Sequence, residues 1–286
     1  MEFSGYCKIN LGLDVVGKRE DGYHNLRMVM QTLQLRDVLD IDAQVADETI
    51  INMTCSVDKL SCGEDNLCVK AARLILDENN VNATVNIHLL KHIPIAAGLA
   101  GGSADAAAVL IGINELLELK MTMEELMALG VKIGADVPYC IMKGTALAEG
   151  IGDELTPLRA MVNYPILLAK PSEGISTAEV YGNLELDRIK HPNIDGLVKA
   201  LDNDDIIGIA TNMGNVLETV TIPRLPVVRD IKRIMMDNKA LGAMMSGSGP
   251  SVFGIFSNEH QASKALSSLK RAGICETALI TYVYNP

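Results

Sequence analysis

The chain contains 286 residues, of which 48% are hydrophobic, 21% charged and 3% aromatic, and its formal net charge is −11. The apolar content excludes an intrinsically disordered chain. Nucleic-acid phosphates and anionic membranes attract clustered Lys and Arg, so the acidic balance argues against either partner. The length is near twice the common domain size and favours two domains.

The N-terminal residues lack the basic stretch and apolar core of a signal peptide. No apolar run approaches the ~18 residues that cross a bilayer, so we expect a cytoplasmic protein. The cysteines form no C-x-x-C pair, and we expect six buried thiols rather than disulfides or a zinc site. They are Cys7, Cys55, Cys62, Cys68, Cys140 and Cys275.

The first 90 residues predict a mixture of strands and one helix. Apolar and polar residues alternate over 8–16, which indicates a half-buried strand, and the Gly- and Asp-containing segment 17–23 predicts a turn into a second strand. We therefore expect a hairpin. The other expected elements are strands at 38–41, 49–53 and 85–90 and a helix at 67–78.

The rest of the chain continues the α+β pattern. Apolar residues at helical spacing predict a helix from about Ser103, and Thr122 and Glu125 have capping-box spacing at the start of another, 122–129. Segment 130–152 predicts a turn and a short strand. A domain boundary near the irregular segment 153–162 gives domains 1–155 and 156–286. The second is expected to hold strands 166–169, 251–256 and 277–283 and helices 206–220, 226–238 and 259–272.

A glycine-rich turn precedes the predicted helix at Ser103. Gly98, Gly101 and Gly102 allow a ligand to approach the backbone, and a helix N-terminus offers free N–H groups and a partial positive charge. Phosphate binding is the favoured interpretation, and a tight turn without a ligand is the alternative. The sequence lacks G-x-x-x-x-G-K-[ST], G-x-G-x-x-G and the protein-kinase motifs, which excludes those classes of phosphate loop.

A second glycine-rich segment runs from Met244 to Gly254. It is either a flexible corner or a functional segment, which would brace the first loop or offer further N–H donors to a substrate. Phosphoryl transfer also needs a positioned hydroxyl, a proton acceptor and cations. Lys8 and Asp136 are candidates, although Lys8 alone reads as a solvated edge residue and Asp136 could cap a helix.

Three further positions have two interpretations each. Ser103 could bind a phosphate or a metal-bound water, or cap the helix. Asp105 could hold a metal ion or favour the helix dipole. Tyr23 and His24 could stack on a base and hydrogen-bond it, or simply pack.

Together these motifs resemble those of the GHMP kinases. The segment P-I-A-A-G-L-A-G-G-S-A-D resembles the family's P-x-x-x-G-L-G-G-G-S-S loop. K-I-N-L, G-K-R-E-D-G-Y-H, G-A-D-V-P-Y and M-S-G-S-G-P-S-V-F-G resemble the branch that phosphorylates a cytidine diphosphate ester of methylerythritol in non-mevalonate isoprenoid biosynthesis. The resemblance extends from Tyr6 to Gly254. It implies an α+β, two-domain GHMP kinase fold, with a ribosomal protein S5 domain 2-like N-terminal domain and a ferredoxin-like C-terminal domain.

The resemblance also implies roles for individual residues. Lys8 and Asp136 would be the catalytic pair, Asn66 would lie near adenine, and Ser103 would be a ligand of Mg²⁺. The ATP phosphates would be bound by Pro94, Ile95, Ala96, Ala97, Gly98, Leu99, Ala100, Gly101, Gly102, Ser103 and Ala104. The cytidine substrate would be bound by Asn10, Tyr23, His24, Thr177 and Tyr181.

The expected co-substrate is ATP and the expected state is a monomer or weak homodimer. The alternatives are a GHMP kinase for a mevalonate-like or homoserine-like substrate, and a non-catalytic nucleotide-binding member of the fold. The chain departs from the family at Ala100, where glycine is usual, at Ala104, where a second serine is usual, and at Tyr6-Cys7, which replaces Pro-Ala. Ala100 is harmless at negative φ but costs roughly 1–3 kcal/mol at positive φ.

Overall fold

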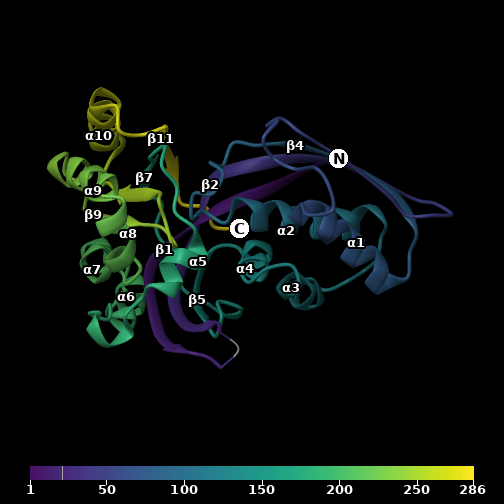
Figure 1. The fold of residues 1–286 in the computed structure, drawn as a ribbon, viewed down its shortest axis with the longest axis horizontal. Helices are drawn as coiled ribbons and strands as arrows, with labels where there is room; N and C mark the ends of the chain where they lie inside the picture. Colours follow the sequence, from purple (N-terminus) through teal and green to yellow (C-terminus); the bar gives the residue numbers. More distant parts are fainter. Residues whose placement is uncertain (21) are drawn as a thin grey trace. The chain divides into compact units, whose positions relative to one another are not determined.

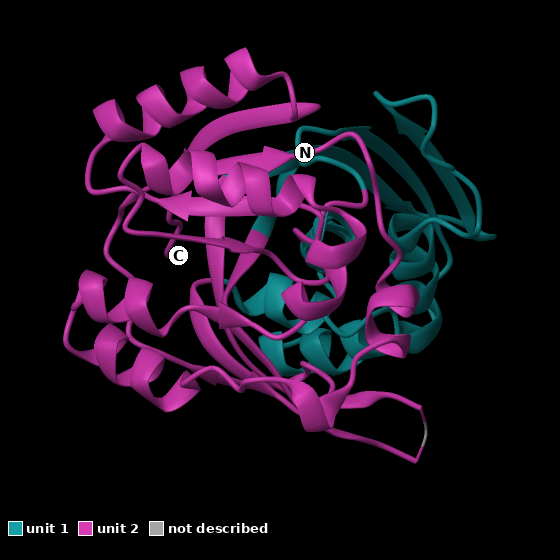
Figure 2. Ribbon diagram, turned by 60° about the vertical axis from the view of Figure 1, so that its left-hand side comes forward, with its two compact units in different colours: residues 1–7, 35–95, 100–143 teal, residues 8–34, 96–99, 144–286 magenta. Residues whose placement is uncertain are grey.

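The computed structural model describes residues 1–20 and 22–286, which form two compact units that are discontinuous along the chain (Figures 1 and 2). Unit 1 comprises residues 1–7, 35–95 and 100–143, and unit 2 comprises residues 8–34, 96–99 and 144–286. The strands β1 (Glu2–Lys18) and β2 (His24–Val45) contribute residues to both units. The units thus differ from a division at residue 155, and that boundary stays a prediction.

In unit 1, helices cover a sheet built on β4 (Ala83–Leu90). β4 pairs antiparallel with the second half of β2 and parallel with β3 (Ile50–Cys55). Alternate residues of β4 are buried, as the period of two requires. The helices are α1 (Leu67–Asn79), α2 (Gly101–Leu116), α3 (Met123–Val131) and α4 (Val137–Met142). α1 and α2 lie side by side (Figure 1).

Small residues allow α2 to pack closely on its neighbours. Four of its first nine residues are the buried alanines Ala104, Ala106, Ala107 and Ala108. A Cβ on Gly5 of β1 would lie 2.9 Å from the carbonyl carbon of Ala104, so the strand and the helix backbone touch there. This packing fixes the helix that follows the glycine-rich turn.

Unit 2 contains two groups of strands. In the first, β1 neighbours β2 as the predicted hairpin, β5 (Thr145–Glu149) pairs with β2, and β6 (Glu154–Pro157) pairs with β5. The second is an antiparallel sheet in the order β11-β7-β10-β9. Its strands are β7 (Pro165–Lys170), β9 (Gly242–Met245), β10 (Val252–Ile255) and β11 (Thr277–Tyr282).

Helices α9 (Val227–Asp237) and α10 (Glu259–Ala272) pack together against this antiparallel sheet (Figure 1). If β7, β9, β10 and β11 are numbered 1 to 4 along the chain, their order in the sheet is 4-1-3-2. Strands and helices alternate along the chain as β-α-β-β-α-β, which is the ferredoxin-like arrangement. The expected α+β fold with a ferredoxin-like second part is confirmed. The remaining elements are α5 (Thr177–Gly182), a 3₁₀ helix (Leu186–Arg188), α6 (Ile194–Asp202), α7 (Ile206–Asn212), β8 (Gly214–Asn215) and α8 (Glu218–Arg224).

Several sequence predictions are wrong in detail. The helix expected over 206–220 is two helices, because Gly214 and Asn215 leave the helical path to pair with Gly12 and Leu13 of β1. G-A-D-V-P-Y-C is not only a turn, since α4 starts within it with proline in its first turn, where a missing N–H costs nothing. The sequence did not predict α5, α6, β6 or β9.

The cysteine and membrane predictions have mixed outcomes. All six cysteines are thiols, but Cys55, Cys62 and Cys275 are only partly buried. In the part of the chain that the structure describes, every helix is too short or too polar to cross a membrane.

Candidate functional site

The N-terminus of α2 is partly exposed, with Gly102 at the surface. The helix begins at Gly101, two residues earlier than expected, and no side chain caps it. Ser103 is therefore the third residue of the helix and not its N-cap. The first-turn N–H groups have no partner within a helix, and together with the helix dipole they suit a phosphate oxygen.

The loop before α2 contains two alanines in the left-handed conformation. Ala100 has φ 56° and ψ 29°, and Ala96 has φ 50°. Alanine at position 100 would be harmless only at negative φ, and its φ is positive. Each non-glycine residue in this region costs of order 1–3 kcal/mol, which the rest of the fold must offset. Such strain is common where a loop is shaped for a ligand.

The tip of the loop, residues 96–99, lies in unit 2 and is held there by backbone contacts. The carbonyl oxygen of Gly98 accepts a hydrogen bond from Ser246 Oγ at 2.9 Å, and that of Leu99 accepts one from the Lys8 N–H at 3.1 Å. Gly98 has φ 72°, and a Cβ there would collide with the carbonyl oxygen of Ser246. The second glycine-rich segment therefore braces the first, as one of its two interpretations predicted.

Lys8 is a buried residue of unit 2 and not a solvated edge lysine. Its side chain is 4% exposed, and its Nζ donates to Asn10 Oδ1 at 3.0 Å. The same oxygen accepts from the N–H of Gly247 at 3.0 Å. Burying an ammonium group is costly, so this position is more typical of a functional cation than of a surface residue.

Asp136 is half-buried in unit 1, immediately before α4. Its side chain makes no capping hydrogen bond and its backbone is already helical, so helix capping does not explain its presence. In the same unit, Ser103 Oγ lies 4.0 Å from where a Cβ of Gly134 would be. The start of α2 and the segment carrying Asp136 are thus neighbours.

Two of the predicted substrate residues meet in unit 2. The ring centroids of His24 and Tyr181 are 5.3 Å apart with an interplanar angle of 38°. Burial, followed by the charge of Lys18, lowers the pKa of His24, so its ring is neutral near pH 7. Thr177 Oγ1 lies 2.8 Å from Ser248 Oγ, and Tyr23 is 62% exposed at the hairpin turn.

Asn66 has a structural task that the sequence analysis did not assign. It is the N-cap of α1, where its Oδ1 accepts from the N–H of Cys68 at 2.8 Å and its Nδ2 donates to the carbonyl oxygen of Ser61 at 2.6 Å. These bonds fix the side chain in unit 1. The predicted contact with adenine stays a prediction.

A buried cluster of Asp37, Lys91 and Asp105 was missed. Lys91 Nζ donates to Asp37 Oδ2 at 2.5 Å and to Asp105 Oδ2 at 2.8 Å. Asp37 Oδ1 also accepts from the N–H groups of His92 and Ile93. The lysine is 5% exposed and the two aspartates 0% and 3%. Asp105 thus pairs with Lys91 in the interior of unit 1. Its sequence context suggests only a metal ligand or a partner of the helix dipole.

The pKa values of Lys91 and Asp105 depend on one another and on Asp37. Burial lowers the pKa of Lys91, but Asp105 and Asp37 outweigh burial and the net pKa is raised. Burial raises the pKa of Asp105 to about 8, against the attraction of Lys91 and with the repulsion of Asp37. Asp105 Oδ1 is buried without a hydrogen-bond partner, which would be costly for a full carboxylate charge.

The residues suit Mg²⁺ only if a ligand brings most of its coordination. Within residues 1–20 and 22–286, no three His, Cys, Asp or Glu side chains are grouped to hold a metal ion. Mg²⁺ usually keeps several waters and binds through substrate phosphates with one or two protein oxygens. The Ser103 hydroxyl in the first turn of α2 is compatible with that pattern.

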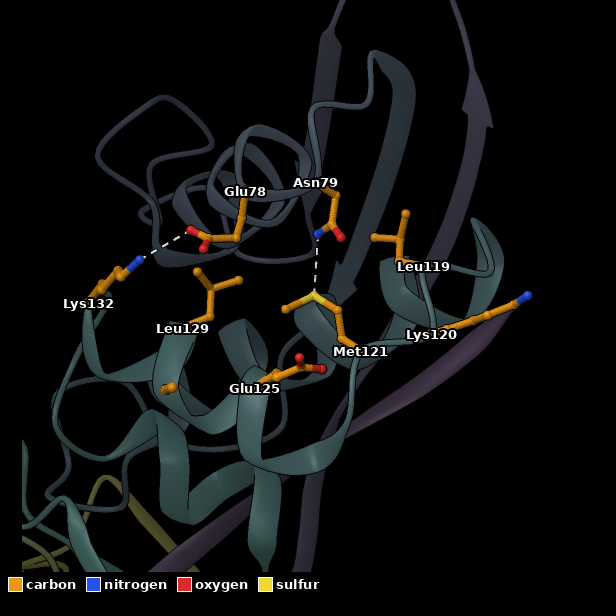
Figure 3. A pocket seen from close by; sticks show the side chains of 9 residues that line it. Glu78, Asn79, Leu119, Lys120, Met121, Glu125, Leu129 and Lys132 are labelled. Carbon is orange, nitrogen blue, oxygen red and sulfur yellow. Dashed lines mark hydrogen bonds and ion pairs between the residues drawn. The ribbon is translucent and has the colours of Figure 1, made fainter.

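A separate pocket of about 390 Å³ lies at the far end of α1 and is unrelated to these residues (Figure 3). It is lined by side chains of α1, α3 and the segment between α2 and α3, including Asn79 and Met121. Lys132 and Glu78 form an ion pair at its edge, with Nζ and Oε2 3.2 Å apart. α1 spans about 20 Å at 1.5 Å per residue, so the pocket is far from Asn66.

Comparison with known proteins gives consistent matches. The family model described as GHMP kinases N terminal domain matches residues 66–144, and that described as GHMP kinases C terminal matches residues 187–275. A protein named 4-diphosphocytidyl-2-C-methyl-D-erythritol kinase from Clostridium perfringens strain 13 is 49% identical over 271 residues, which covers 94% of this chain and 93% of that protein. A protein of the same name from Lachnospira eligens is 48% identical, with coverage of 98% and 97%.

Solved structures show the same similarity. The crystal structure of a 4-(cytidine 5'-diphospho)-2C-methyl-D-erythritol kinase superposes with a TM-score of 0.85 at 29% identity and covers 100% of both chains. Homoserine kinase from Cytophaga hutchinsonii has a TM-score of 0.77 at 20% identity, covering 99% of this chain and 94% of the other. The second similarity is one of fold.

Proposed function

The chain belongs to the GHMP kinase family, and from this premise we propose that it phosphorylates the 2-hydroxyl of 4-diphosphocytidyl-2-C-methyl-D-erythritol with ATP. The products are the 2-phosphate and ADP, and the reaction belongs to non-mevalonate isoprenoid precursor biosynthesis. The observation that carries this proposal is the 49% identity to a kinase of that name over nearly the whole of both chains. The partly exposed N-terminus of α2 supports it, since it supplies donors for ATP phosphates.

We assign the phosphoryl-transfer step to Lys8 and Asp136. Asp136 accepts the proton of the 2-hydroxyl or orients that hydroxyl for attack on the γ-phosphorus of ATP. The positive charge of Lys8 lowers the pKa of the alcohol. The burial of Lys8 and the absence of a capping bond from Asp136 support these roles.

The phosphates of ATP bind to residues 94–104, chiefly through backbone N–H groups, and Asn66 lies near the adenine. Ser103 would hold Mg²⁺, which would offset the negative charge that develops during phosphoryl transfer. The cytosine lies among Tyr23, His24 and Tyr181, and Asn10 and Thr177 bind other parts of the substrate. The neighbouring rings of His24 and Tyr181 support this assignment.

Further parts of the proposal concern the setting of the reaction. We place the enzyme in the cytoplasm as a monomer or weak homodimer that acts on a small molecule, without a nucleic acid or membrane partner. The boundary of its two GHMP kinase domains is placed near residue 155.

The test is a substrate panel in an assay coupled to ADP release. We expect Mg²⁺-dependent turnover with 4-diphosphocytidyl-2-C-methyl-D-erythritol. We expect little turnover with mevalonate or homoserine, because neither carries a cytosine ring. The acceptor should carry the new phosphate on its 2-oxygen, as read by ³¹P and ¹H NMR of the product. Turnover of mevalonate or homoserine with a higher kcat/KM would contradict the substrate, and binding of nucleotide without turnover of any alcohol would contradict the kinase activity.

A further inference from the structure

The buried cluster of Asp37, Lys91 and Asp105 joins the two ends of the phosphate loop. Lys91 precedes Pro94, the first residue of the loop, and Asp105 follows Ala104, its last. The Nζ–Oδ2 bond of 2.8 Å therefore connects residues 14 positions apart across the base of the loop. Asp37 of β2 anchors the same ammonium group and also receives the N–H groups of the next two residues, His92 and Ile93.

Stability alone is a poor explanation for this cluster. Moving three ionisable groups out of water is costly, and buried ion pairs are often no more stable than apolar side chains of similar volume. The surrounding residues would suit apolar replacements, because Cys68, Ile93 and Ala104 are all buried in the same unit. The position of the cluster at the loop is the feature that apolar residues would not reproduce, since they lack directional bonds.

The first turn of α2 rests directly on the lysine. A Cβ on Gly101 would lie 3.3 Å from Lys91 Nζ and 3.1 Å from Ile93 Cγ2, so the backbone of the turn touches both residues. Gly101 is the first residue of α2, whose N–H groups are the donors available to a phosphate. A shift of Lys91 would therefore change where these donors point.

We propose that Lys91, Asp37 and Asp105 are positioning residues that close the phosphate loop at its base and hold the first turn of α2 in the geometry that binds nucleotide phosphates. The inference rests on the proposed ATP-dependent function. All three side chains are almost fully buried, so we expect them to act through the backbone of the loop and not by direct contact with the nucleotide. Their effect should fall on nucleotide binding, because the cluster contacts Gly101 at the start of α2.

The experiment measures ADP binding by calorimetry in the presence of Mg²⁺, with the full chain and three single variants. Lys91→Met removes the ammonium group but keeps an unbranched side chain. We expect it to weaken ADP binding roughly 10- to 100-fold, the range typical for residues that orient a binding group. Asp105→Asn keeps an oxygen that can accept from Nζ, so we expect a smaller loss.

Two further variants serve as comparisons. Lys91→Met/Asp105→Asn should bind ADP no more weakly than Lys91→Met alone, because the two residues act through one bond. Lys132→Met removes a lysine of the same unit that pairs with Glu78 at the surface, 58% exposed, and should bind ADP like the wild type. In steady-state kinetics, the variants of the cluster should raise the KM for ATP and leave the KM for the cytidine substrate within about twofold.

Circular dichroism and thermal unfolding identify which variants are folded. Folded Lys91→Met and Asp105→Asn proteins that bind ADP as tightly as the wild type would overturn the inference. Equal losses of affinity for ADP and the cytidine substrate would overturn it too, since they would indicate general damage. If Lys91→Met does not fold, the same comparison on Asp105→Asn decides. A wild-type chain that binds ADP but does not phosphorylate the cytidine substrate would refute the proposed function and not this inference.

Discussion

Replacing Gly98 by alanine should damage the chain through two separable effects. Gly98 has φ 72°, and an added Cβ would collide with the carbonyl oxygen of Ser246 and lie 3.1 Å from that of Gly249. All these atoms belong to the backbone of unit 2, so no flexible side chain can move aside. We therefore expect Gly98→Ala to lower the free energy of unfolding and to weaken ATP binding.

The size of the effect follows from the two contributions. A left-handed conformation costs a non-glycine residue roughly 1–2 kcal/mol, and forcing an extra carbon into a packed site costs about 1–3 kcal/mol more. The sum is about 2–5 kcal/mol. For a chain of this size, each kcal/mol lowers Tm by roughly 2–4 °C, so the decrease should be about 4–20 °C.

Two glycines elsewhere in unit 2 separate these contributions. Gly273 has φ 64° with no atom within 4 Å of an added Cβ, so Gly273→Ala should show only the conformational cost. Gly174 has open space and no positive φ, so Gly174→Ala should be neutral or stabilise by about 0.4–1 kcal/mol. Urea unfolding at constant m-value measures all three. A loss for Gly98→Ala no larger than that for Gly273→Ala would refute the predicted collision.

Three other substitutions test the loop, the proposed catalytic pair and the proposed base-binding residues. Ala100→Gly should relieve about 1–2 kcal/mol of backbone strain, while the greater entropy of the unfolded chain should cost about 0.4–1 kcal/mol. Urea unfolding should therefore show a net gain in the free energy of unfolding of up to about 1.5 kcal/mol. A clear loss would mean that alanine is not strained at φ 56° here. Asp136→Ala should lower kcat by roughly 10²–10⁴ with the KM for ATP nearly unchanged, and retained turnover would refute its role. Tyr181→Ala should remove about 1–3 kcal/mol of stacking, which raises the KM for the cytidine substrate about 5- to 150-fold. An equal rise in the KM for ATP would argue against Tyr181 as a base-binding residue.

Local patterns were enough to predict the elements whose signals are local. The helix predicted at 67–78 is α1, and Thr122 and Glu125 form the predicted capping box at the start of α3. Both depend on spacings of three or four residues within one segment. Gly98, Gly101 and Gly102 likewise located the turn into α2, because backbone freedom is a property of the residue itself.

Predictions failed where distant partners decide the structure. Nothing in segment 206–220 indicates that Gly214 will pair with Gly12, about 200 positions earlier, yet that pairing divides the expected helix. The conformation of Ala100 is another case, since its alanine favours negative φ and only the closed loop imposes 56°. Tertiary contacts outweigh local propensity at both sites.

The charged cluster at the base of the loop has the same origin. Asp37, Lys91 and Asp105 lie 54 and 14 positions apart and carry no motif in common. Each residue taken alone is most simply a surface charge, because Lys and Asp are seldom fully buried unless paired. Only the fold brings Asp37, Lys91 and Asp105 together as one buried group.

The location of the positive charges explains how a chain of net charge −11 can serve as a kinase for polyphosphate substrates. Lys8 and Lys91 are both almost fully buried, at 4% and 5% exposure, where the lower dielectric makes each charge act more strongly than a surface lysine. Lys8 donates to the neutral Asn10, and Lys91 to two aspartates that share its charge. Because two aspartates share its charge, Lys91 contributes chiefly through the directions of its hydrogen bonds. For this reason we place Lys91 beneath the loop and not in the chemical step.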